Sequence, residues 1–140
     1  MFAGSCVFCG LLAGEGPAEW LVREDRAAAL LPLPETRLAP GHTLVISNAH
    51  AVGVQDASLA DLHATMSLVR RVSRSMATTM GALGVNVLNA SGPGSDQSVP
   101  HLHFHVVPRW RGDALDTWPT ERSTHNPAPD WLRDLRAELD

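Results

Sequence analysis

The chain has 140 residues, 44% of them hydrophobic, with a formal net charge of −4 and a pI near 5.9. These values suit one domain with one core, and the acidic balance excludes a basic surface for duplex nucleic acid, so we expect no nucleic-acid partner. The longest apolar stretch, around residues 27–33, is too short to span a bilayer, and residues 1–12 lack the basic start of a signal peptide. We therefore expect a cytoplasmic protein with no membrane partner.

The first half of the chain predicts short strands followed by one long helix. Residues 19–23 and 27–31 flank a turn and predict a hairpin, and residues 43–47 predict a further strand. From residue 59 to residue 80 the apolar side chains recur at three- and four-residue steps, which is typical of a helix. Ser58 and Asp61 give it a capping-box-like start, and Gly81 and Gly84 end it. Its predicted apolar positions are Leu59, Leu62, Met66, Val69, Met76 and Met80.

The second half predicts two more strands and a separate tail. Residues 85–88 and 101–107 predict strands joined by a Gly/Ser-rich loop, which completes an α+β fold with an antiparallel sheet packed on one helix. Beyond Arg109, tryptophans and prolines are scattered among polar residues, so this segment is expected to be irregular. Asp130 then suits the N-cap of a short C-terminal helix. That helix carries Trp131, Leu132, Leu135 and Leu139 on one side. Packing against the sheet is a simpler interpretation of the tryptophans than stacking on a substrate base.

The most informative segment is residues 100–108, where His101, His103 and His105 alternate with apolar residues. On a strand this alternation places the three imidazoles on one face and the apolar side chains on the other. The sequence contains no lysine and no tyrosine, so catalysis falls to histidine, serine or a carboxylate. One interpretation makes one imidazole a nucleophile or general base that its neighbours orient. The other makes all three a catalytic metal cage, with Asp96 or Asp113 nearby.

Four motifs together resemble the histidine triad (HIT) nucleotide hydrolases and transferases, in particular the bacterial HINT-like branch. Residues 101–107 (HLHFHVV) resemble the family signature, and residues 92–99 (GPGSDQSV) resemble its phosphate loop. Residues 39–46 (APGHTLVI) resemble its Pro-Gly-His strand, and residues 6–10 (CVFCG) its N-terminal CxxC. The resemblance implies a single HIT-like domain over residues 1–140, with about five strands, a core at about 5–111 and a variable tail at 112–140.

The resemblance implies an enzyme, a HIT-type nucleotide hydrolase or nucleotidyl transferase. It would cleave the α-phosphate bond of a phosphoramidate- or adenylate-type nucleoside monophosphate derivative through a nucleotidyl-histidine intermediate. His103 would be the nucleophile, with its other ring nitrogen held by a backbone carbonyl. His105 and His42 would bond phosphate oxygens or guide protons, and Asn89, Gln97 and Ser98 would contact the substrate. The family also implies a homodimer and no organic cofactor.

Two cysteines and two histidines suggest a zinc site. Cys6 and Cys9 are followed by His50 and later by His101, a spacing that suits a Cys₂His₂ set. In the resemblance, related proteins hold a structural zinc in this way. Reduced cysteines without metal and a redox-active CxxC are the alternatives. A zinc with these four ligands would have no open position for water, so the chemistry would not depend on it.

One segment departs from the family pattern. Members often carry Asp-Ile-x-Pro before the Pro-Gly-His strand, where the aspartate binds ribose hydroxyls, but residues 31–35 here are LPLPE. Glu35 is a replacement with different spacing. The altered ribose segment leaves a non-catalytic nucleotide-binding module as the alternative of another class. Within the enzyme class, dinucleoside polyphosphate hydrolysis is the alternative activity.

Overall fold

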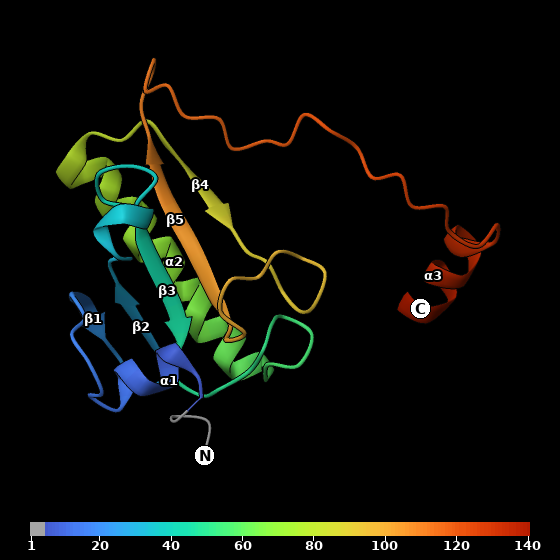
Figure 1. Ribbon diagram of the computed structural model, residues 1–140, viewed down its shortest axis with the longest axis horizontal. Coiled ribbons are helices and arrows are strands. Elements are labelled where there is room, and N and C mark those ends of the chain that lie inside the picture. The colour runs from blue at the N-terminus through green and yellow to red at the C-terminus, as the bar shows by residue number, and fades with distance from the viewer. Residues whose placement is uncertain (1–4) are drawn as a thin grey trace.

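A five-stranded antiparallel sheet organises the chain in the computed structural model, which describes residues 5–140 (Figure 1). Along the chain the elements are α1 Val7–Leu12, β1 Trp20–Arg23, β2 Ala27–Leu30, the 3₁₀ turn η2 Pro34–Thr36, β3 Thr43–Ser47, α2 Leu59–Met80, β4 Gly84–Leu88, β5 His103–Arg109 and α3 Trp131–Leu139. The strand order is β1-β2-β3-β5-β4, so the β5 strand inserts between β3 and β4. The predicted α+β class and antiparallel sheet are confirmed.

The long helix α2 begins and ends where the capping residues predict. The Asp61 N–H donates to Oγ of Ser58 at 3.1 Å, and Gly81 closes the helix in the left-handed conformation with φ of 66°. Its buried face was only partly predicted. The structure buries Thr65, Leu68, Val69, Val72 and Met76. Leu59, Met66 and Met80, which the periodicity placed on the apolar face, are exposed.

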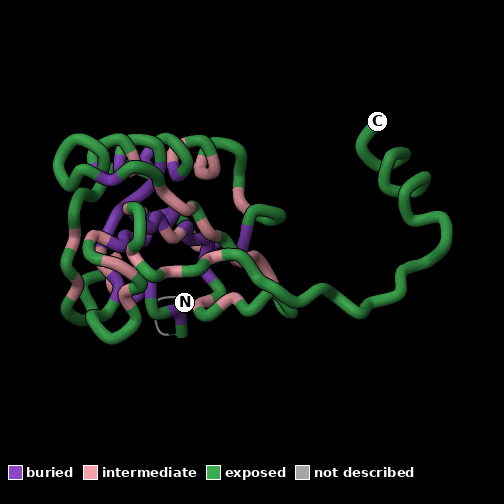
Figure 2. The backbone as a smooth tube through the Cα atoms, turned by 90° about the horizontal axis from the view of Figure 1, so that it is seen from above, coloured by how far each residue is buried: buried purple, intermediate pink, exposed green. Residues whose placement is uncertain are grey.

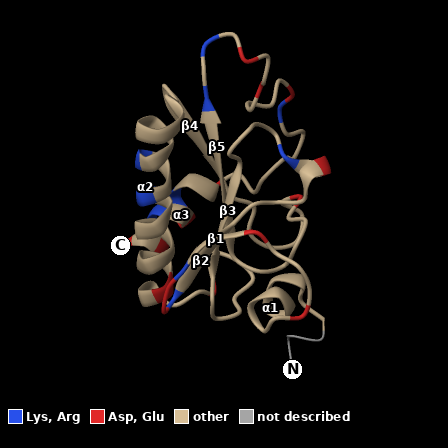
Figure 3. Cartoon of the chain, turned by 90° about the vertical axis from the view of Figure 1, so that its left-hand side faces the viewer, with Lys and Arg blue, Asp and Glu red and all other residues tan. Residues whose placement is uncertain are grey.

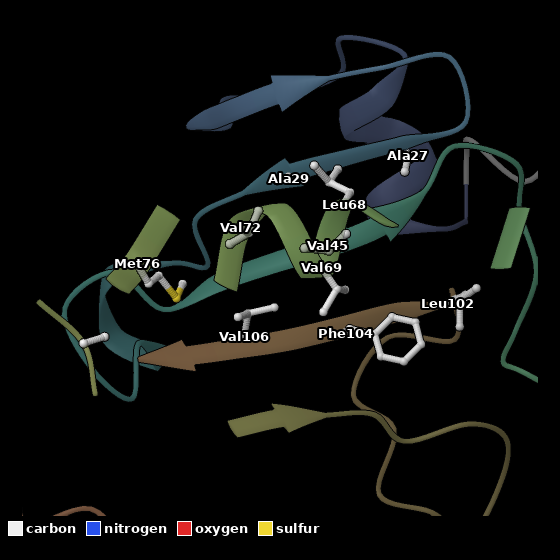
Figure 4. Packing of buried hydrophobic residues seen from close by; sticks show 11 residues of the cluster. Ala27, Ala29, Val45, Leu68, Val69, Val72, Met76, Leu102, Phe104 and Val106 are labelled. Atoms are coloured by element: carbon white, nitrogen blue, oxygen red, sulfur yellow. The ribbon is translucent and has the colours of Figure 1, made fainter. Parts of the chain in front are cut away.

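The hydrophobic core lies between α2 and one face of the sheet (Figure 4). Val45, Phe104 and Val106 point from the central strands toward Leu68 and Val69 of the helix. The opposite face is covered in part by α1, where a second cluster includes Phe8, Leu44 and Ile46. Since side chains alternate along a strand, residues that flank Phe104 in β5 lie on this second face.

The tail does not join either cluster. Residues 118–140 are exposed throughout, and they lead away from the sheet before α3 forms (Figures 1 and 2). Asp130 occupies the N-cap of α3 as predicted, although its carboxylate pairs with Arg133 at 3.2 Å instead of capping a backbone N–H. The expected packing of tryptophans on the sheet holds for Trp110, whereas the Trp118 side chain is 81% exposed.

Among residues 5–140, no helix is long and apolar enough to cross a membrane.

Candidate functional site

Strand β5 begins at His103, two residues later than predicted, and this divides the three histidines between two sites. Strand β3 ends at Ser47, whose N–H donates to the Leu102 carbonyl at 3.3 Å, so His101 has no strand partner and lies in a bend. In register, His103 faces Ile46 and His105 faces Leu44 of β3. Both imidazoles therefore lie on the sheet face opposite α2, while the ring of His101 turns toward the cysteines. The alternative of one metal cage built from all three is wrong.

His103 is held by a backbone carbonyl in one tautomer. Its ring is 3% exposed, and Nδ1–H donates to the carbonyl oxygen of His101 at 2.7 Å. Because Nδ1 carries the proton of the neutral ring, Nε2 carries an available lone pair. Burial lowers the pKa of His103 below its usual value. The ring is therefore neutral near pH 7, the state in which an imidazole is a nucleophile.

His105 and His42 form a hydrogen-bonded pair whose tautomers follow from one backbone contact. The Leu38 N–H donates to Nδ1 of His42 at 2.9 Å, so the proton of the neutral His42 ring is on Nε2. That Nε2 lies 2.9 Å from Nδ1 of His105 and donates to it, which leaves the proton of His105 on its own Nε2. Burial, with smaller contributions from His103 and His42, lowers the pKa of His105 to about 4. His105 is thus a neutral hydrogen-bond donor.

A pocket of about 230 Å³ opens beside these two rings. Besides His103 and His105 it is lined by Leu38, Leu88, Asn89, Ala90, Asp96, Gln97 and Ser98. The structure thus brings together five of the six predicted substrate-binding residues at one pocket. His42, the sixth, reaches it through His105.

The polar residues around the pocket differ in what their side chains already bind. Nδ2 of Asn89 donates to the His103 carbonyl at 2.9 Å, which fastens the end of β4 to the strand of the histidines. Nε2 of Gln97 donates to the Val52 carbonyl at 2.6 Å, and its Oε1 accepts from the Gly92 N–H at 3.1 Å. Gln97 therefore braces the loop. Ser98 is exposed, and its hydroxyl has no hydrogen-bond partner among the described residues.

The second site gathers Cys6, Cys9, His50 and His101, whose ligand atoms all lie within 4.8 Å of one another. Cys6 caps the N-terminus of α1, and Cys9 follows within its first turn. Nε2–H of His101 donates to the Ser47 carbonyl at 2.6 Å, so its Nδ1 lone pair points to the two sulfurs at 3.3 and 3.5 Å. Nδ1 of His50 lies 3.4 Å from Sγ of Cys9.

These distances fit a tetrahedral zinc ion. Zn–S bonds of about 2.3 Å and Zn–N bonds of about 2.0 Å place neighbouring ligand atoms about 3.3 to 3.8 Å apart. The hydrogen bond from His101 to Ser47 is the outer contact that fixes a metal-binding imidazole in one tautomer. Burial, with Cys6 adding to it, raises the pKa of the Cys9 thiol to about 11, opposite to the lowered pKa of a redox-active CxxC.

The segment that departs from the family pattern forms the turn η2 at Pro34–Thr36, and Glu35 in it is exposed. Nε of Arg37 donates to the Pro32 carbonyl at 2.9 Å, which braces this turn. A neighbouring hollow is lined mainly by apolar side chains, with Glu19 and Arg37 as its charged residues. Glu35 does not line the pocket of the histidines.

The two aspartates named as possible metal partners and the two remaining histidines differ in where they lie. Asp96 lines the pocket with a backbone φ of 64°, whereas Asp113 binds Arg109 at 2.8 Å at the root of the tail. His63 on α2 and His125 in the tail are exposed. The backbone groups of Leu38 and Ser47, which set the tautomers, were not predicted, because a backbone donor or acceptor leaves no mark in the sequence.

The fold and the paired histidine sites define a protein of the HIT class. The model of the HIT domain family matches residues 13–112, and the chain belongs to this family.

Its relatives include bacterial and plant proteins. The chain is 34% identical over 111 residues to an uncharacterized HIT-like protein of Mycobacterium tuberculosis, covering 79% of this chain and 75% of that one. It is 29% identical over 116 residues to adenylylsulfatase HINT3 of Arabidopsis thaliana, covering 83% of this chain and 57% of that one. A solved zinc-bound histidine triad protein of Mycobacterium smegmatis is 30% identical, with a TM-score of 0.76 and coverage of 98% and 96%.

Proposed function

We propose that this protein is a nucleotide hydrolase or nucleotidyl transferase that forms a covalent nucleotidyl-histidine at His103. The observation that carries the proposal is the hydrogen bond from His103 Nδ1 to the His101 carbonyl. It leaves the Nε2 lone pair of a buried, neutral ring beside a pocket that a phosphate group could enter. The membership of the HIT family supports the same role.

In the first step, Nε2 of His103 attacks the α-phosphorus of the substrate. A P–N bond forms, and the bond from phosphorus to the leaving group breaks with its electron pair on the leaving group. Because Nδ1 keeps its proton, the ring gains positive charge, which the His101 carbonyl stabilises through their hydrogen bond. The Nε2–H of His105 donates to a non-bridging phosphate oxygen. A sulfate or carboxylate leaves as an anion, whereas an amine takes a proton from solvent.

In the second step, water attacks phosphorus on the nucleotidyl-histidine. The P–N bond breaks, its electron pair returns to Nε2 of His103, and the proton of the attacking water passes to solvent. The products are the nucleoside monophosphate and the original neutral ring. Ser98 is the residue at the pocket with a free hydroxyl, so we assign it a hydrogen bond to phosphate, and we assign Gln97 and Asn89 to holding the loop and strand in place.

We also propose that Cys6, Cys9, His50 and His101 hold a structural zinc ion. With four protein ligands, a zinc ion held by this cluster would have no open position for substrate or water. When bound, zinc supplies a cross-link between α1 and the bend that precedes β5. The same bend carries the carbonyl that orients His103, so the cross-link supports the nucleophile without taking part in the reaction.

The substrate class follows from the lack of a side chain at this pocket that could protonate the leaving group. His42 and His105 are neutral and no lysine or tyrosine is present, so adenylate-type substrates whose leaving group is already an anion suit this pocket best. A distant relative is an adenylylsulfatase, which supports the same class. Phosphoramidates are the second class, and dinucleoside polyphosphates the third.

The test is release of nucleoside monophosphate from a panel of substrates. Wild type, His103→Ala and His63→Ala are each assayed with the same five substrates. These are adenylyl sulfate, an aminoacyl adenylate, adenosine phosphoramidate, diadenosine polyphosphate and a nucleotide sugar. We expect turnover with wild type and with His63→Ala, whose ring is exposed on α2, and a loss of at least about 1000-fold with His103→Ala. Nucleotide binding without turnover in wild type would instead identify a non-catalytic binding module.

A further inference from the structure

One charged side chain at the pocket of the histidines takes no part in the two chemical steps. Asp96 lines this pocket from the loop between β4 and β5, beside His103 and His105. It is exposed, and among residues 5–140 its carboxylate has no hydrogen-bond or ion-pair partner. A carboxylate that no other group neutralises is therefore present at the pocket where the phosphate group of a substrate would bind.

The protein places no positive charge at this pocket to balance the carboxylate. The described residues that line the pocket include no arginine, and the sequence contains no lysine. His103 and His105 are neutral, as their lowered pKa values require. Figure 3 shows several of the arginines on α2, which packs on the other face of the sheet. A substrate can therefore supply the positive charge that Asp96 lacks.

The backbone conformation of Asp96 sets this residue apart within its loop. Its φ is 64°, in the left-handed region, and the other left-handed residues of the loop are Gly92 and Gly94. An aspartate in this conformation is less stable than a glycine, and a hydrogen bond from its side chain to nearby backbone can offset the difference. Asp96 makes no such bond in the part of the chain that the structure describes. The loop thus carries a carboxylate at a position where its own stability would favour glycine.

The geometry of phosphoryl transfer decides which part of a substrate meets Asp96. The nucleophile and the leaving group lie on opposite sides of phosphorus when the displacement is in line. His103 is 3% exposed at the floor of the pocket, whereas Asp96 is exposed at its rim. The leaving group therefore points away from the floor, toward the rim. The nucleoside has room on another side, where Leu38 lines the pocket and Arg37 lines the neighbouring apolar hollow.

We propose, on the basis of the function proposed above for His103, that Asp96 selects substrates whose leaving group carries a positive charge away from the bond that breaks. The Asp96 carboxylate attracts a cation such as an ammonium group at the rim, whereas it repels a sulfate, a polyphosphate or a carboxylate there. The chemical steps at His103 are unchanged. An adenylate whose leaving carboxylate also bears an ammonium group is then a better substrate than adenylyl sulfate.

Three adenosine phosphoramidates that differ only at the far end of the amine test this selection. The amines are ethylenediamine, propylamine and β-alanine, so the far end is an ammonium group, a methyl group or a carboxylate. The value of kcat/KM is measured for each compound with wild type and Asp96→Asn, without added divalent cations. We expect Asp96→Asn to lower kcat/KM about fivefold for the ammonium compound, to raise it about threefold for the carboxylate compound and to change it by less than about twofold for the methyl compound.

Two further variants separate the charge of Asp96 from other effects. Asp25→Asn, at the exposed turn between β1 and β2, removes the same charge away from the pocket and should change none of the three values. Asp96→Gly suits the left-handed backbone and should give the same three changes as Asp96→Asn, because both remove the carboxylate. Raising the salt concentration should weaken the preference of wild type. An equal change for all three compounds in Asp96→Asn, or no change, would overturn the proposal.

Binding measurements distinguish a failure of this selection from a failure of the proposed function. Dissociation constants of the same compounds are measured by calorimetry with His103→Ala and with the double variant that adds Asp96→Asn. We expect the double variant to bind the ammonium compound about fivefold more weakly. That result supports selection by Asp96 even if wild type hydrolyses none of the compounds, in which case the proposed function fails alone. Turnover in wild type with neither kcat/KM nor binding dependent on Asp96 overturns only the selection, and absence of binding by all three compounds overturns both.

Discussion

Acidification should destabilise this protein through the hydrogen-bonded pair of His42 and His105. The pKa of His105 is lowered to about 4 by burial, whereas a histidine in the unfolded chain titrates near about 6.5. Between these values the unfolded state binds more protons than the folded state. The stabilising contribution is therefore fully present above about pH 6.5 and is lost as the pH falls toward about 4.

The size of the effect follows from the two pKa values. Between about pH 7 and pH 4.5, a fully shielded ring with this shift would lose about 2.4 kcal/mol of unfolding free energy. The ring of His105 is only half-buried, so solvent screening reduces the expected loss to about 1–2 kcal/mol. His42, whose pKa is also lowered by burial, adds to the total in the same direction.

Urea unfolding at the two pH values measures this loss. All samples contain a chelator, so that release of metal in acid does not contribute. Each protein loses some unfolding free energy between about pH 7 and pH 4.5. This loss should be smaller by about 1–2 kcal/mol in His105→Gln than in wild type, because glutamine does not titrate. His63→Gln, with an exposed ring on α2, should keep the wild-type difference. If His105→Gln lost as much unfolding free energy as wild type, the reasoning on the His42–His105 pair would be refuted.

Three further predictions concern the core, the metal and the end of α2. Leu68→Ala should lower the unfolding free energy by about 3 kcal/mol, since Leu68 is 2% exposed, whereas Met66→Ala should lower it by under about 1 kcal/mol. Equal losses in urea unfolding would contradict the observed burial. Cys9→Ala should reduce bound zinc, measured by atomic absorption, from one per chain to near none, with His63→Ala as control; full zinc content in Cys9→Ala would reject the ligand set. Gly81→Ala should lower the unfolding free energy, measured by thermal unfolding, by about 1 kcal/mol because the φ of Gly81 is 66°. Gly84→Ala should lower it less, since Gly84 has no positive φ and has open space around an added Cβ. The reverse order would count against the assigned helix end.

Local patterns predicted the elements of this fold well. The capping residues Ser58 and Gly81 predicted the ends of α2, and the alternation in residues 101–107 identified β5, which begins at His103. The face that α2 buries was harder to predict, because apolar and small polar residues occur around much of the helix. Thr65 is fully buried, and its hydroxyl donates to the Asp61 carbonyl at 2.6 Å within the helix, so burial leaves no unpaired polar group.

The site shows where sequence reasoning ends. Motif spacing named the residues that meet at the pocket and at the cysteine cluster, but it placed His101 in one row with His103 and His105. The division depends on where β3 ends, at Ser47, and this is a property of strand pairing over more than fifty residues of separation. The tautomers likewise depend on the Leu38 N–H and the His101 carbonyl, which any residue supplies.

The most direct test of the central claim is to find the nucleotide on His103. Wild-type protein is mixed with an adenylyl substrate labelled at the α-phosphorus, quenched in base, in which a phosphorus–nitrogen bond to histidine survives, and digested for peptide mass spectrometry. We expect one adenylyl group per active chain on the peptide that contains His103, and none in His103→Ala, whose unfolding free energy is checked in parallel. Label on another residue, or undiminished turnover in folded His103→Ala, would contradict the account.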